Sequence, residues 1–294
     1  MNTQTVFRTK PLMPNFGVEI LDVDVTKAEP DELAAVVDTF HRNGALVLRG
    51  QVMSQQQQLA FTRLFGAPEG NSRLEFCDPD YPEIYVISNK VVNGRAIGDP
   101  EAGIGWHTDF AYGAHPAMCT ILHAQEVPAE GSDTLLADLC AAWNALPPER
   151  QEELDGLVVH HSFAQLMRKR NAPMTRQQKE DLPDVFHPLI RRHPADGRKA
   201  LYVSGTTKGI LNIANPDGIE MMEELIRYAT QDCFVYRHKW RVGDILVWDN
   251  RVTLHTGTLF DKTRYIRHCH RTWVTGEAPI GAVAPASATG RALQ

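Results

Sequence analysis

The chain has 294 residues, of which 43% are hydrophobic and 22% are charged, and its formal net charge is −6. This composition is typical of a soluble globular protein that is long enough to bury a sizeable core. The acidic balance speaks against nucleic-acid binding, because domains with that function carry a basic excess. No stretch approaches the roughly 18 apolar residues of a membrane span.

The N-terminal residues and the cysteines indicate the compartment. The start MNTQTVFRTKPLMPNF lacks the apolar core of a signal peptide. The five cysteines are scattered, odd in number and free of any CxxC spacing, which argues against a disulfide framework or a structural zinc site. We therefore expect a cytoplasmic protein with reduced thiols.

The first quarter of the chain alternates strands and helices. Residues 17–25, GVEILDVDV, alternate apolar and acidic residues and predict a strand. Residues 31–44 predict an amphipathic helix that stops at a glycine, and residues 45–50 predict a short buried strand. Residues 54–66 open with Ser54 followed three positions later by a glutamine, which is the pattern of a capping box.

Further along, short β-branched or aromatic runs separated by turn residues dominate. They are EIYVISN, CTILHAQEV, TLLAD, LYVSG, CFVYRHKW, DILVWDN and YIRHCHRTWV. Helices are expected only within residues 141–156 and 218–231. Few βαβ units recur, so we predict a mainly β protein, a jelly roll with flanking helices.

No linker divides the chain, so we expect a single domain over residues 1–294. The small, polar residues 283–294 predict a flexible tail. Residues 164–186 are polar, charged and interrupted by proline, which is typical of a lid or of a solvated loop insertion.

The segment GIGWHTDFAYG contains a pair of metal-binding residue types. His107 and Asp109 are two residues apart and leave the same face of an extended chain. With His255, in LVWDNRVTLHTG, they would form the facial triad of non-haem Fe(II) oxygenases, which leaves coordination positions open. A hydrogen-bonded His–Asp pair of purely structural role is the alternative that the spacing alone leaves open.

The basic run RYIRHCHRTW divides by strand parity. Arg267 and Arg271 share one face, and His268 and His270 share the other. The apparent basic and histidine cluster is therefore not one patch. A guanidinium placed twelve residues after His255 can bind a carboxylate bidentately. Salt bridges to acidic residues are the structural alternative.

Taken together, these motifs resemble the TauD/TfdA-like family of Fe(II)/2-oxoglutarate-dependent oxygenases. The resemblance begins at GVEILDVDVTK and continues through WHTDFAY, GSDTLLAD and HPLIRRHPADGRKALYVSG to GDILVWDNRVTLHTG and RHCHR. It thus covers nearly the whole chain, with several motifs in the family's order. The fold that it implies is a double-stranded β-helix of the jelly-roll type.

The resemblance also implies roles for individual residues. His107, Asp109 and His255 match the iron ligands, and Thr134 and Arg267 match the residues that hold the 2-oxoglutarate carboxylate. Arg271 matches a second arginine that binds the substrate's anionic group or assists the co-substrate. Two departures from the family pattern stand out. The loop before Arg267 is longer by one residue, which makes Arg264 a rival anion ligand, and Ser132 replaces a glycine, a change that we expect to be mild.

The implied cofactors are Fe(II), 2-oxoglutarate and O₂. The implied reaction hydroxylates an unactivated C–H bond while 2-oxoglutarate is decarboxylated to succinate and CO₂. We expect a small anionic substrate, a carboxylate, sulfonate or sulfate, bound by Arg271 and lined by Asn89, Phe110 and Tyr112. Taurine itself is not favoured, because the segment NSRLEFCDPDYPE lacks the histidine of the taurine-type pocket.

Two other functions remain open at this point. One is a non-catalytic jelly-roll protein that binds a metal or a ligand, and the other is a zinc hydrolase that uses the same two histidines and carboxylate. Neither a membrane nor a nucleic-acid partner is expected. By analogy with family members, we expect a homo-oligomer, either a dimer or a tetramer.

Overall fold

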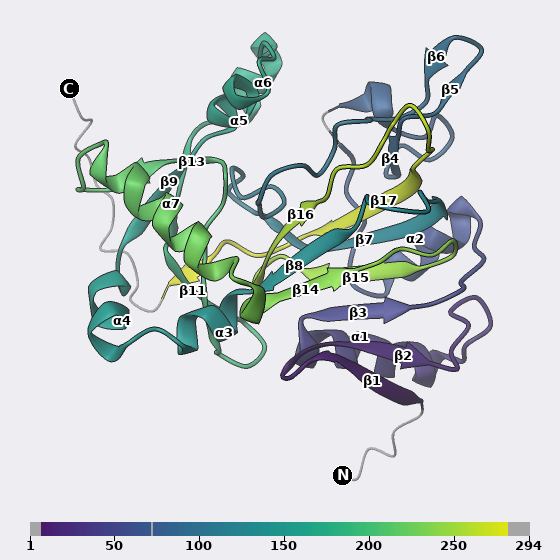
Figure 1. The fold of residues 1–294 in the computed structure, drawn as a ribbon, viewed down its shortest axis with the longest axis horizontal. Helices are drawn as coiled ribbons and strands as arrows, with labels where there is room; N and C mark the ends of the chain where they lie inside the picture. The colour runs from purple at the N-terminus through teal and green to yellow at the C-terminus, as the bar shows by residue number, and fades with distance from the viewer. Residues whose placement is uncertain (1–6, 72, 282–294) are drawn as a thin grey trace.

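The fold is built around a seven-stranded, mainly antiparallel sheet, shown in the computed structural model of residues 7–71 and 73–281 (Figure 1). Only one pair of neighbouring strands, β2 and β3, runs parallel. In spatial order the strands are β1 (Arg8–Met13), β2 (Phe16–Leu21), β3 (Ala45–Leu48), β15 (Ile245–Asp249), β7 (Ala117–Glu126), β17 (His268–Thr275) and β4 (Tyr85–Ser88).

A smaller antiparallel sheet packs against the inner face of this large sheet. It contains β14 (Val235–His238), β8 (Thr134–Asp138) and β16 (Thr253–Gly257). The side chains between the two sheets form one apolar core, to which β7, β15 and β17 contribute from one side and Leu136 of β8 from the other. This arrangement confirms the predicted mainly β jelly roll, since two antiparallel sheets enclose a common interior.

Two helices cover the outer face of the large sheet. Helix α1 (Pro30–Asn43) ends at Gly44, whose φ of 74° permits the left-handed turn back into β3. Helix α2 (Gln55–Arg63) begins with the predicted capping box at Ser54 but ends before the expected stop at Gly66. Val36 and Phe40 of α1 and Phe61 of α2 pack onto the sheet.

The central part of the chain forms a second layer beside the jelly roll. One small sheet contains β9 (Val158–His161), β10 (Val185–Pro188) and β13 (Thr207–Ile210). The other contains β11 (Ile190–Arg192) and β12 (Lys199–Leu201), joined by β18 (Ile280–Gly281) from much later in the chain. Helices α3 (Leu139–Asn144), α4 (Pro148–Leu154) and α7 (Asp217–Ala229) accompany them. The helix expected over 141–156 is two helices, because Pro147 and Pro148 interrupt it.

The expected lid segment, 164–186, contains two short helices, α5 (Phe163–Lys169) and α6 (Arg176–Asp181). Both project from the top of the molecule in Figure 1. The remaining short elements are the hairpin of β5 (Val91–Val92) and β6 (Arg95–Ala96) and the 3₁₀ turns Leu74–Phe76 and Asp232–Phe234. The expected tail, 283–294, lies outside the described residues.

Several predicted strands are shorter than expected, among them the first, which ends at Leu21 and not at Val25. Strand β17 begins only at His268, so Arg267 precedes it, and a register shift follows at once between His268 and Cys269. The strand expected at LYVSG ends at Leu201. Beyond Leu201 the chain leaves the sheet and bonds to another loop, since the amide of Gly205 donates to the carbonyl of Trp106 at 3.2 Å.

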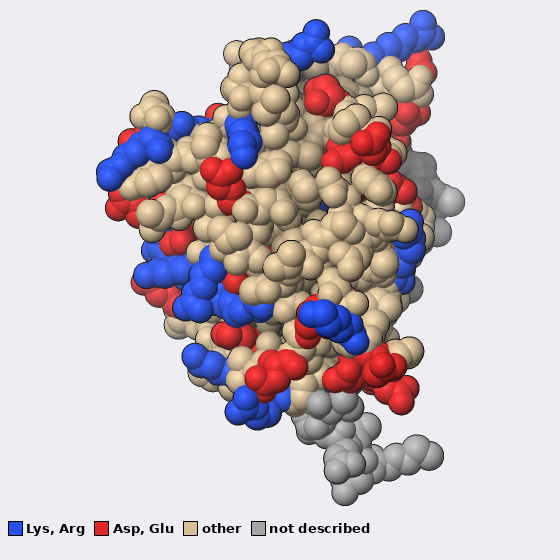
Figure 2. Space-filling model, turned by 90° about the vertical axis from the view of Figure 1, so that its right-hand side faces the viewer, with Lys and Arg blue, Asp and Glu red and all other residues tan. Residues whose placement is uncertain are grey.

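The charge distribution on the surface and the state of the cysteines can be compared with what the composition predicts. On the face shown in Figure 2, cationic and anionic side chains are interspersed. Within the described residues no helix has the length and apolarity needed to cross a bilayer. All five cysteines are free thiols.

Candidate active site

The three predicted metal ligands converge at one end of the jelly-roll interior. His107 and His255 form an antiparallel bridge, in which the amide of each donates to the carbonyl of the other at 2.9 Å. The two Nε2 atoms each lie 3.7 Å from one of the carboxylate oxygens of Asp109. One potential ligand atom from each residue lies within 4.8 Å of the others, so one cation can contact all three.

The protonation states of these side chains suit a divalent metal. Burial lowers the pKa of both histidines, to about 3 for His255, so their imidazoles are neutral. Burial would raise the pKa of Asp109, but the guanidinium of Arg271 and the two histidines hold it at about 2. Two neutral imidazoles and one carboxylate are the donor set of a non-haem Fe(II) centre.

Neighbouring backbone and side-chain groups fix the orientation of these candidate ligands. Nδ1 of His107 lies 2.7 Å from the carbonyl of Gly105, which leaves Nε2 free to face the metal. The hydroxyl of Thr120 donates to Asp109 at 2.7 Å, and the side-chain amide of Asn250 donates to the same hydroxyl at 2.9 Å. The sequence reasoning missed Thr120, and the only signal for Asn250 was its place at the end of a strand before His255.

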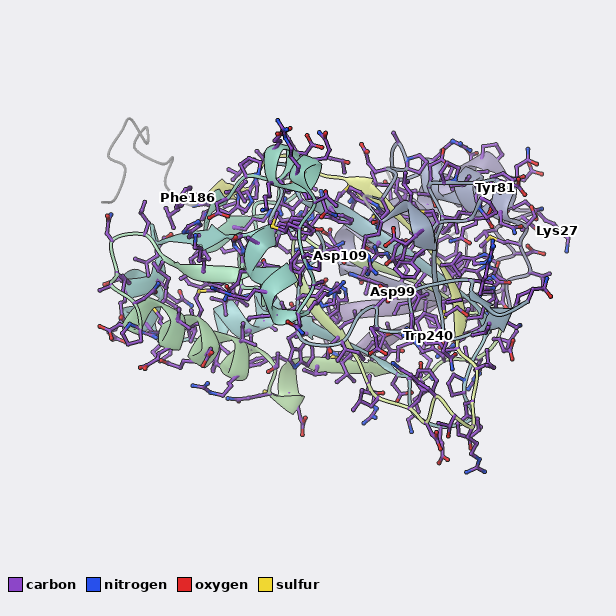
Figure 3. The ribbon with its side chains drawn as sticks, turned by 90° about the horizontal axis from the view of Figure 1, so that it is seen from above. Lys27, Tyr81, Asp99, Asp109, Phe186 and Trp240 are labelled. Atoms are coloured by element: carbon purple, nitrogen blue, oxygen red, sulfur yellow. The ribbon has the colours of Figure 1, made fainter. Side chains whose placement is uncertain are left out.

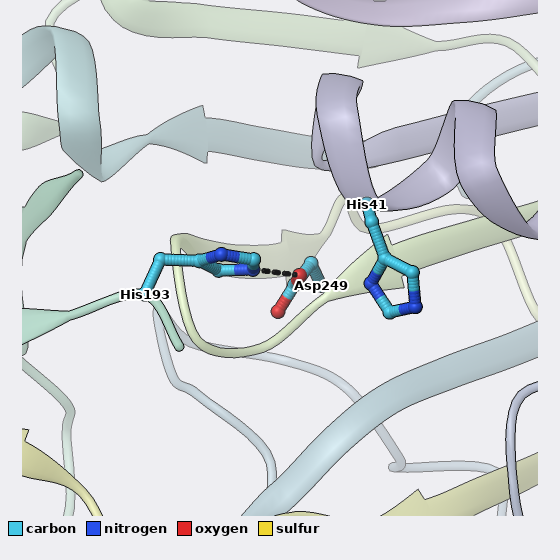
Figure 4. Close-up of side chains that lie close together, drawn as sticks. All are labelled: His41, His193 and Asp249. Carbon is cyan, nitrogen blue, oxygen red and sulfur yellow. Dashed lines mark hydrogen bonds and ion pairs between the residues drawn. The ribbon is translucent and has the colours of Figure 1, made fainter. Parts of the chain in front are cut away.

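A second group of metal-ligand residue types, His41, His193 and Asp249, lies between α1 and the end of β15 (Figure 4). Its carboxylate already has four hydrogen bonds. Arg251 donates three of them, from its amide, Nε and Nη2, and His193 Nε2 lies 3.0 Å from the carboxylate. A cation would have to displace Arg251, so we interpret this group as a buried ion-pair network.

The two residues expected to hold 2-oxoglutarate are both buried. Thr134 begins β8, and its hydroxyl accepts a hydrogen bond from Trp240 at 3.1 Å. Arg267 lies beside Cys269, and its Nε is buried without a hydrogen-bond partner in the described part of the chain. A buried guanidinium nitrogen without a partner fits an anionic ligand, because leaving such a donor unpaired is costly.

The rival arginine lies elsewhere. The side chain of Arg264 is 68% exposed, lies over the ring of Tyr265 and faces Glu130 at 3.7 Å. It is therefore a surface residue, whereas Arg267 points into the protein interior.

The departure at Ser132 is less mild than expected. Its φ of 58° is left-handed, a region that favours glycine, and its buried hydroxyl has no partner in the described residues. The preceding Gly131 is also left-handed, and a Cβ there would lie 2.6 Å from the carbonyl oxygen of Leu259. The turn before Thr134 thus carries backbone strain that the family's second glycine would relieve.

A cavity of about 430 Å³ opens beside the proposed metal ligands. His107 and Asp109 form part of its wall, with Phe110, Tyr112 and Arg271. In Figure 3, Asp109 and Asp99 lie in the interior, away from the peripheral Lys27 and Tyr81. Further wall residues include Arg73, Tyr85, Asp99, Ile104, Trp106, and Phe163, Leu166, Met167, Lys169 and Arg170 at α5 and its C-terminal end.

Asn89 differs from its predicted role, because it does not line this cavity. Its side-chain amide donates to the carbonyls of Lys262 and Tyr265, at 3.2 and 2.9 Å, and its Oδ1 accepts from the amide of Arg267 at 2.8 Å. Asn89 therefore holds the loop that positions Arg267. Sequence alone could not separate the two roles, because a polar residue at a strand end suits both.

The family model described as "Taurine catabolism dioxygenase TauD, TfdA family" matches residues 8–273. The chain belongs to this family. It is 35% identical over 263 residues to the alpha-ketoglutarate-dependent 2,4-dichlorophenoxyacetate dioxygenase of Cupriavidus pinatubonensis, covering 85% of this chain and 92% of that protein. It is also 33% identical to pentalenolactone F synthase of Streptomyces arenae, with 81% and 84% of the two chains covered.

Solved structures also resemble this chain. The crystal structure of AAD-2 in complex with Mn(II) and N-oxalylglycine matches with a TM-score of 0.80 and 29% identity, covering 93% of this chain and 99% of that one. A taurine dioxygenase from Burkholderia xenovorans matches with a TM-score of 0.78 and 30% identity, over 94% and 91% of the two chains. These findings confirm the predicted family and the class of enzyme, a 2-oxoglutarate-dependent dioxygenase, and do not favour the zinc-hydrolase or non-catalytic alternatives.

Proposed function

We propose that this dioxygenase hydroxylates a C–H bond of a small organic monoanion whose body is apolar and of aromatic size. The observation that carries the proposal is the composition of the cavity wall. Arg271 supplies a guanidinium close to the metal ligands, and Ile104, Phe110, Tyr112 and Leu166 supply apolar surface. Pockets of this kind bind the apolar body by burial and orient it through a few polar groups.

His107, Asp109 and His255 would hold Fe(II), since they present deprotonated donors to one point. When bound, Fe(II), 2-oxoglutarate and O₂ would supply the oxidising chemistry: 2-oxoglutarate loses CO₂ and takes up one oxygen atom of O₂ to become succinate, and the other oxygen atom enters the substrate C–H bond. The protein's contribution is to hold the substrate C–H near the metal ligands and to exclude water from the cavity.

Thr134 and Arg267 would hold the distal carboxylate of 2-oxoglutarate. Arg267 offers a buried Nε without a partner in the described residues, and hydrogen bonds from the Asn89 side chain to backbone groups fix the loop that carries Arg267. Arg271 lines the cavity and Arg267 does not. This difference favours a division of roles in which Arg267 serves the co-substrate and Arg271 serves the substrate.

The substrate class draws on the relatives as well as on the cavity. The names of similar proteins include dioxygenases for 2,4-dichlorophenoxyacetate, for phenoxypropionate and for sulfate esters. Each is an anion with a larger uncharged body. An aryl-substituted carboxylate fits this cavity best, because aromatic side chains line much of it and the guanidinium of Arg271 can bind a carboxylate bidentately.

Anaerobic visible spectroscopy with Fe(II) tests the metal and co-substrate roles. Addition of 2-oxoglutarate should produce a charge-transfer band in the wild type and in His115→Ala, an exposed control in the same loop, but not in His107→Ala. Bound Fe(II) without a band in the wild type would contradict the co-substrate assignment. Activity supported by Zn(II) but not by Fe(II) would favour the hydrolase alternative.

Succinate release then tests the substrate class. 2,4-Dichlorophenoxyacetate, its neutral methyl ester, an alkyl sulfate and taurine form a suitable panel. The aryloxy carboxylate should stimulate succinate release most strongly, and its methyl ester should not. Equal stimulation by the acid and the ester would contradict an anion-binding role for Arg271.

Assembly and location are further parts of the proposal. A homo-oligomer, a dimer or a tetramer, in the cytoplasm is what the family resemblance and the reduced cysteines support. Sedimentation velocity of the purified protein tests the first part, and a sedimentation coefficient matching a 32.9 kDa monomer would contradict it.

A further inference from the structure

Arg271 has few polar partners for a cation in a buried wall. Its side chain is 13% exposed, and its Nε is buried without a hydrogen-bond partner in the described residues. Its one ion pair within residues 7–71 and 73–281 is long, since Nη1 lies 3.5 Å from Oδ1 of Asp109. Charge-assisted N–H···O hydrogen bonds are usually about 2.7–2.9 Å long. Something other than Asp109 therefore fixes this guanidinium.

Two aromatic rings flank the guanidinium. The guanidinium carbon lies 4.8 Å from the centroid of Tyr85 and 6.0 Å from that of Phe110. Both distances are within the range of a cation–π contact. Tyr85 is the direct cross-strand neighbour of Arg271 on β4, so the sheet register itself places its ring there.

The ring of Tyr85 is held from its far end. Its hydroxyl donates to Oδ2 of Asp99 at 2.8 Å, and Nη1 of Arg73 donates to the same oxygen at 2.6 Å. Asp99 is buried, and its Oδ1 accepts the amide of Glu101. The Tyr85 ring is thus fixed between a buried carboxylate and the Arg271 guanidinium.

Phe110 is held against its backbone preference. Its φ of 55° is unusual for a bulky residue and costs backbone energy. Its ring stacks on Trp273, with centroids 3.9 Å apart and planes inclined by 20°. Trp273 lies two residues beyond Arg271 on β17, on the same face. The strained turn therefore directs the Phe110 ring toward Arg271 and Trp273.

We propose that Tyr85 and Phe110 are positioning residues that hold the Arg271 guanidinium on the cavity wall, where it selects an anionic substrate, and away from Asp109. Without the rings, Arg271 is free to shorten its 3.5 Å contact with Asp109 into a tight ion pair. That pair would compete with the substrate for the cation and with the metal for the carboxylate. This inference rests on the proposed role of Arg271 in substrate binding.

The test measures two bindings separately, with no need for turnover. The first is the affinity of 2,4-dichlorophenoxyacetate for protein loaded with Mn(II) and 2-oxoglutarate, by calorimetry. The second is the affinity for Mn(II) alone, by the electron paramagnetic resonance signal of the free ion. The variants are Tyr85→Leu, Phe110→Leu and Arg271→Gln, with Tyr85→Phe as the matched control that keeps the ring.

We expect Tyr85→Leu and Phe110→Leu each to weaken binding of the anion by about tenfold, a loss between those of an exposed and of a fully desolvated cation–π contact. Both should also weaken Mn(II) binding several-fold. Adding Arg271→Gln should restore Mn(II) binding, because the competing cation is gone. Tyr85→Phe should lie within about threefold of wild type in both measurements.

Two different failures can be distinguished. If Arg271→Gln leaves anion binding unchanged, the proposed substrate role of Arg271 fails. If Arg271→Gln abolishes anion binding but both leucine variants bind like wild type, the role of Arg271 stands and the positioning role of the rings is wrong. Mn(II) binding that stays weak in Tyr85→Leu/Arg271→Gln would also overturn the proposal, because the loss would then not act through Arg271. Phe110→Leu keeps the test decisive if Tyr85→Leu fails to fold.

Discussion

The hydroxyl of Thr120 on β7 lies 2.7 Å from Oδ2 of Asp109, so an interior strand of the large sheet orients the carboxylate of the proposed metal triad. The same hydroxyl accepts a hydrogen bond from Asn250, whose Oδ1 accepts from the indole of Trp248 and from the amide of Asp109. Asp109, the proposed metal ligand, is therefore tied to two neighbouring strands, β7 and β15, through side chains outside the proposed ligand set.

Thr120→Val should weaken metal binding by about 10- to 100-fold, the usual cost of losing an outer-shell hydrogen bond to a metal ligand. The replacement has nearly the same shape, so the effect comes from the lost hydroxyl. Titration with Mn(II) measures the affinity. Thr120→Ser keeps the hydroxyl and should bind metal almost like wild type, and equal affinities for the valine and serine variants would contradict the role.

Arg267→Gln should raise the 2-oxoglutarate concentration needed for the Fe(II) charge-transfer band by about 10- to 100-fold, since a hydrogen-bonded contact to a charged group contributes about 1.5–3 kcal/mol. Arg264→Gln, at the exposed site three residues earlier, is the matched control and should leave it unchanged. The opposite pattern would move the carboxylate anchor to Arg264.

Acid should destabilise the fold through buried histidines. Burial lowers the pKa of His161 to about 3 and that of His187 to about 4, and the two rings lie 5.5 Å apart. In the unfolded chain each has a pKa of about 6.5, so between pH 6.5 and 4 the unfolded state binds more protons. The stability that these groups contribute is present above pH 6.5 and falls as the pH drops toward 4.

In that range, each of these histidines can lower the free energy of unfolding by up to about 1.4 kcal/mol for each unit by which the pH falls. Urea unfolding at intervals between pH 7 and pH 4.5 measures it. Other histidines titrate as well, so the pH dependence of the free energy of unfolding is compared between the wild type and each of His161→Gln and His187→Gln. Each variant should lose less stability per pH unit than the wild type. Identical slopes in wild type and both variants would contradict the assignment.

Ser132→Gly should stabilise the protein by about 1 kcal/mol, because glycine adopts the left-handed φ without penalty and removes a buried, unpaired hydroxyl. The gain is reduced by the greater freedom of glycine in the unfolded chain. Chemical denaturation provides the measurement. Gly131→Ala, next to it, should instead destabilise, since its Cβ would meet the carbonyl of Leu259. A loss of stability in Ser132→Gly would contradict the strain argument.

Local patterns in the sequence predicted most of the elements, and they pointed to three candidate metal ligands whose side chains the structure brings together. The capping box at Ser54 and the stop at Gly44 were correct because they depend on contacts within a few residues. The limits of β17 were not, because the strand begins where β4 and β7 offer partners, and pairing depends on distant residues. Asn89 was assigned to the cavity because its true partners are also distant in the sequence. Its side chain bonds to a loop more than 170 residues away.

By itself, the sequence determined the residue types and the order of the strands along the chain. These predicted the family, the jelly roll and the candidate metal ligands His107, Asp109 and His255. Only the tertiary structure decided what surrounds the triad: Thr120 against Asp109, Tyr85 and Phe110 beside Arg271, and Arg267 buried apart from the cavity wall. The physical reason is range. Propensity, capping and alternation act between near neighbours along the chain, whereas burial, cation–π contacts and hydrogen bonds to metal ligands arise only when strands far apart in the sequence become neighbours in a sheet.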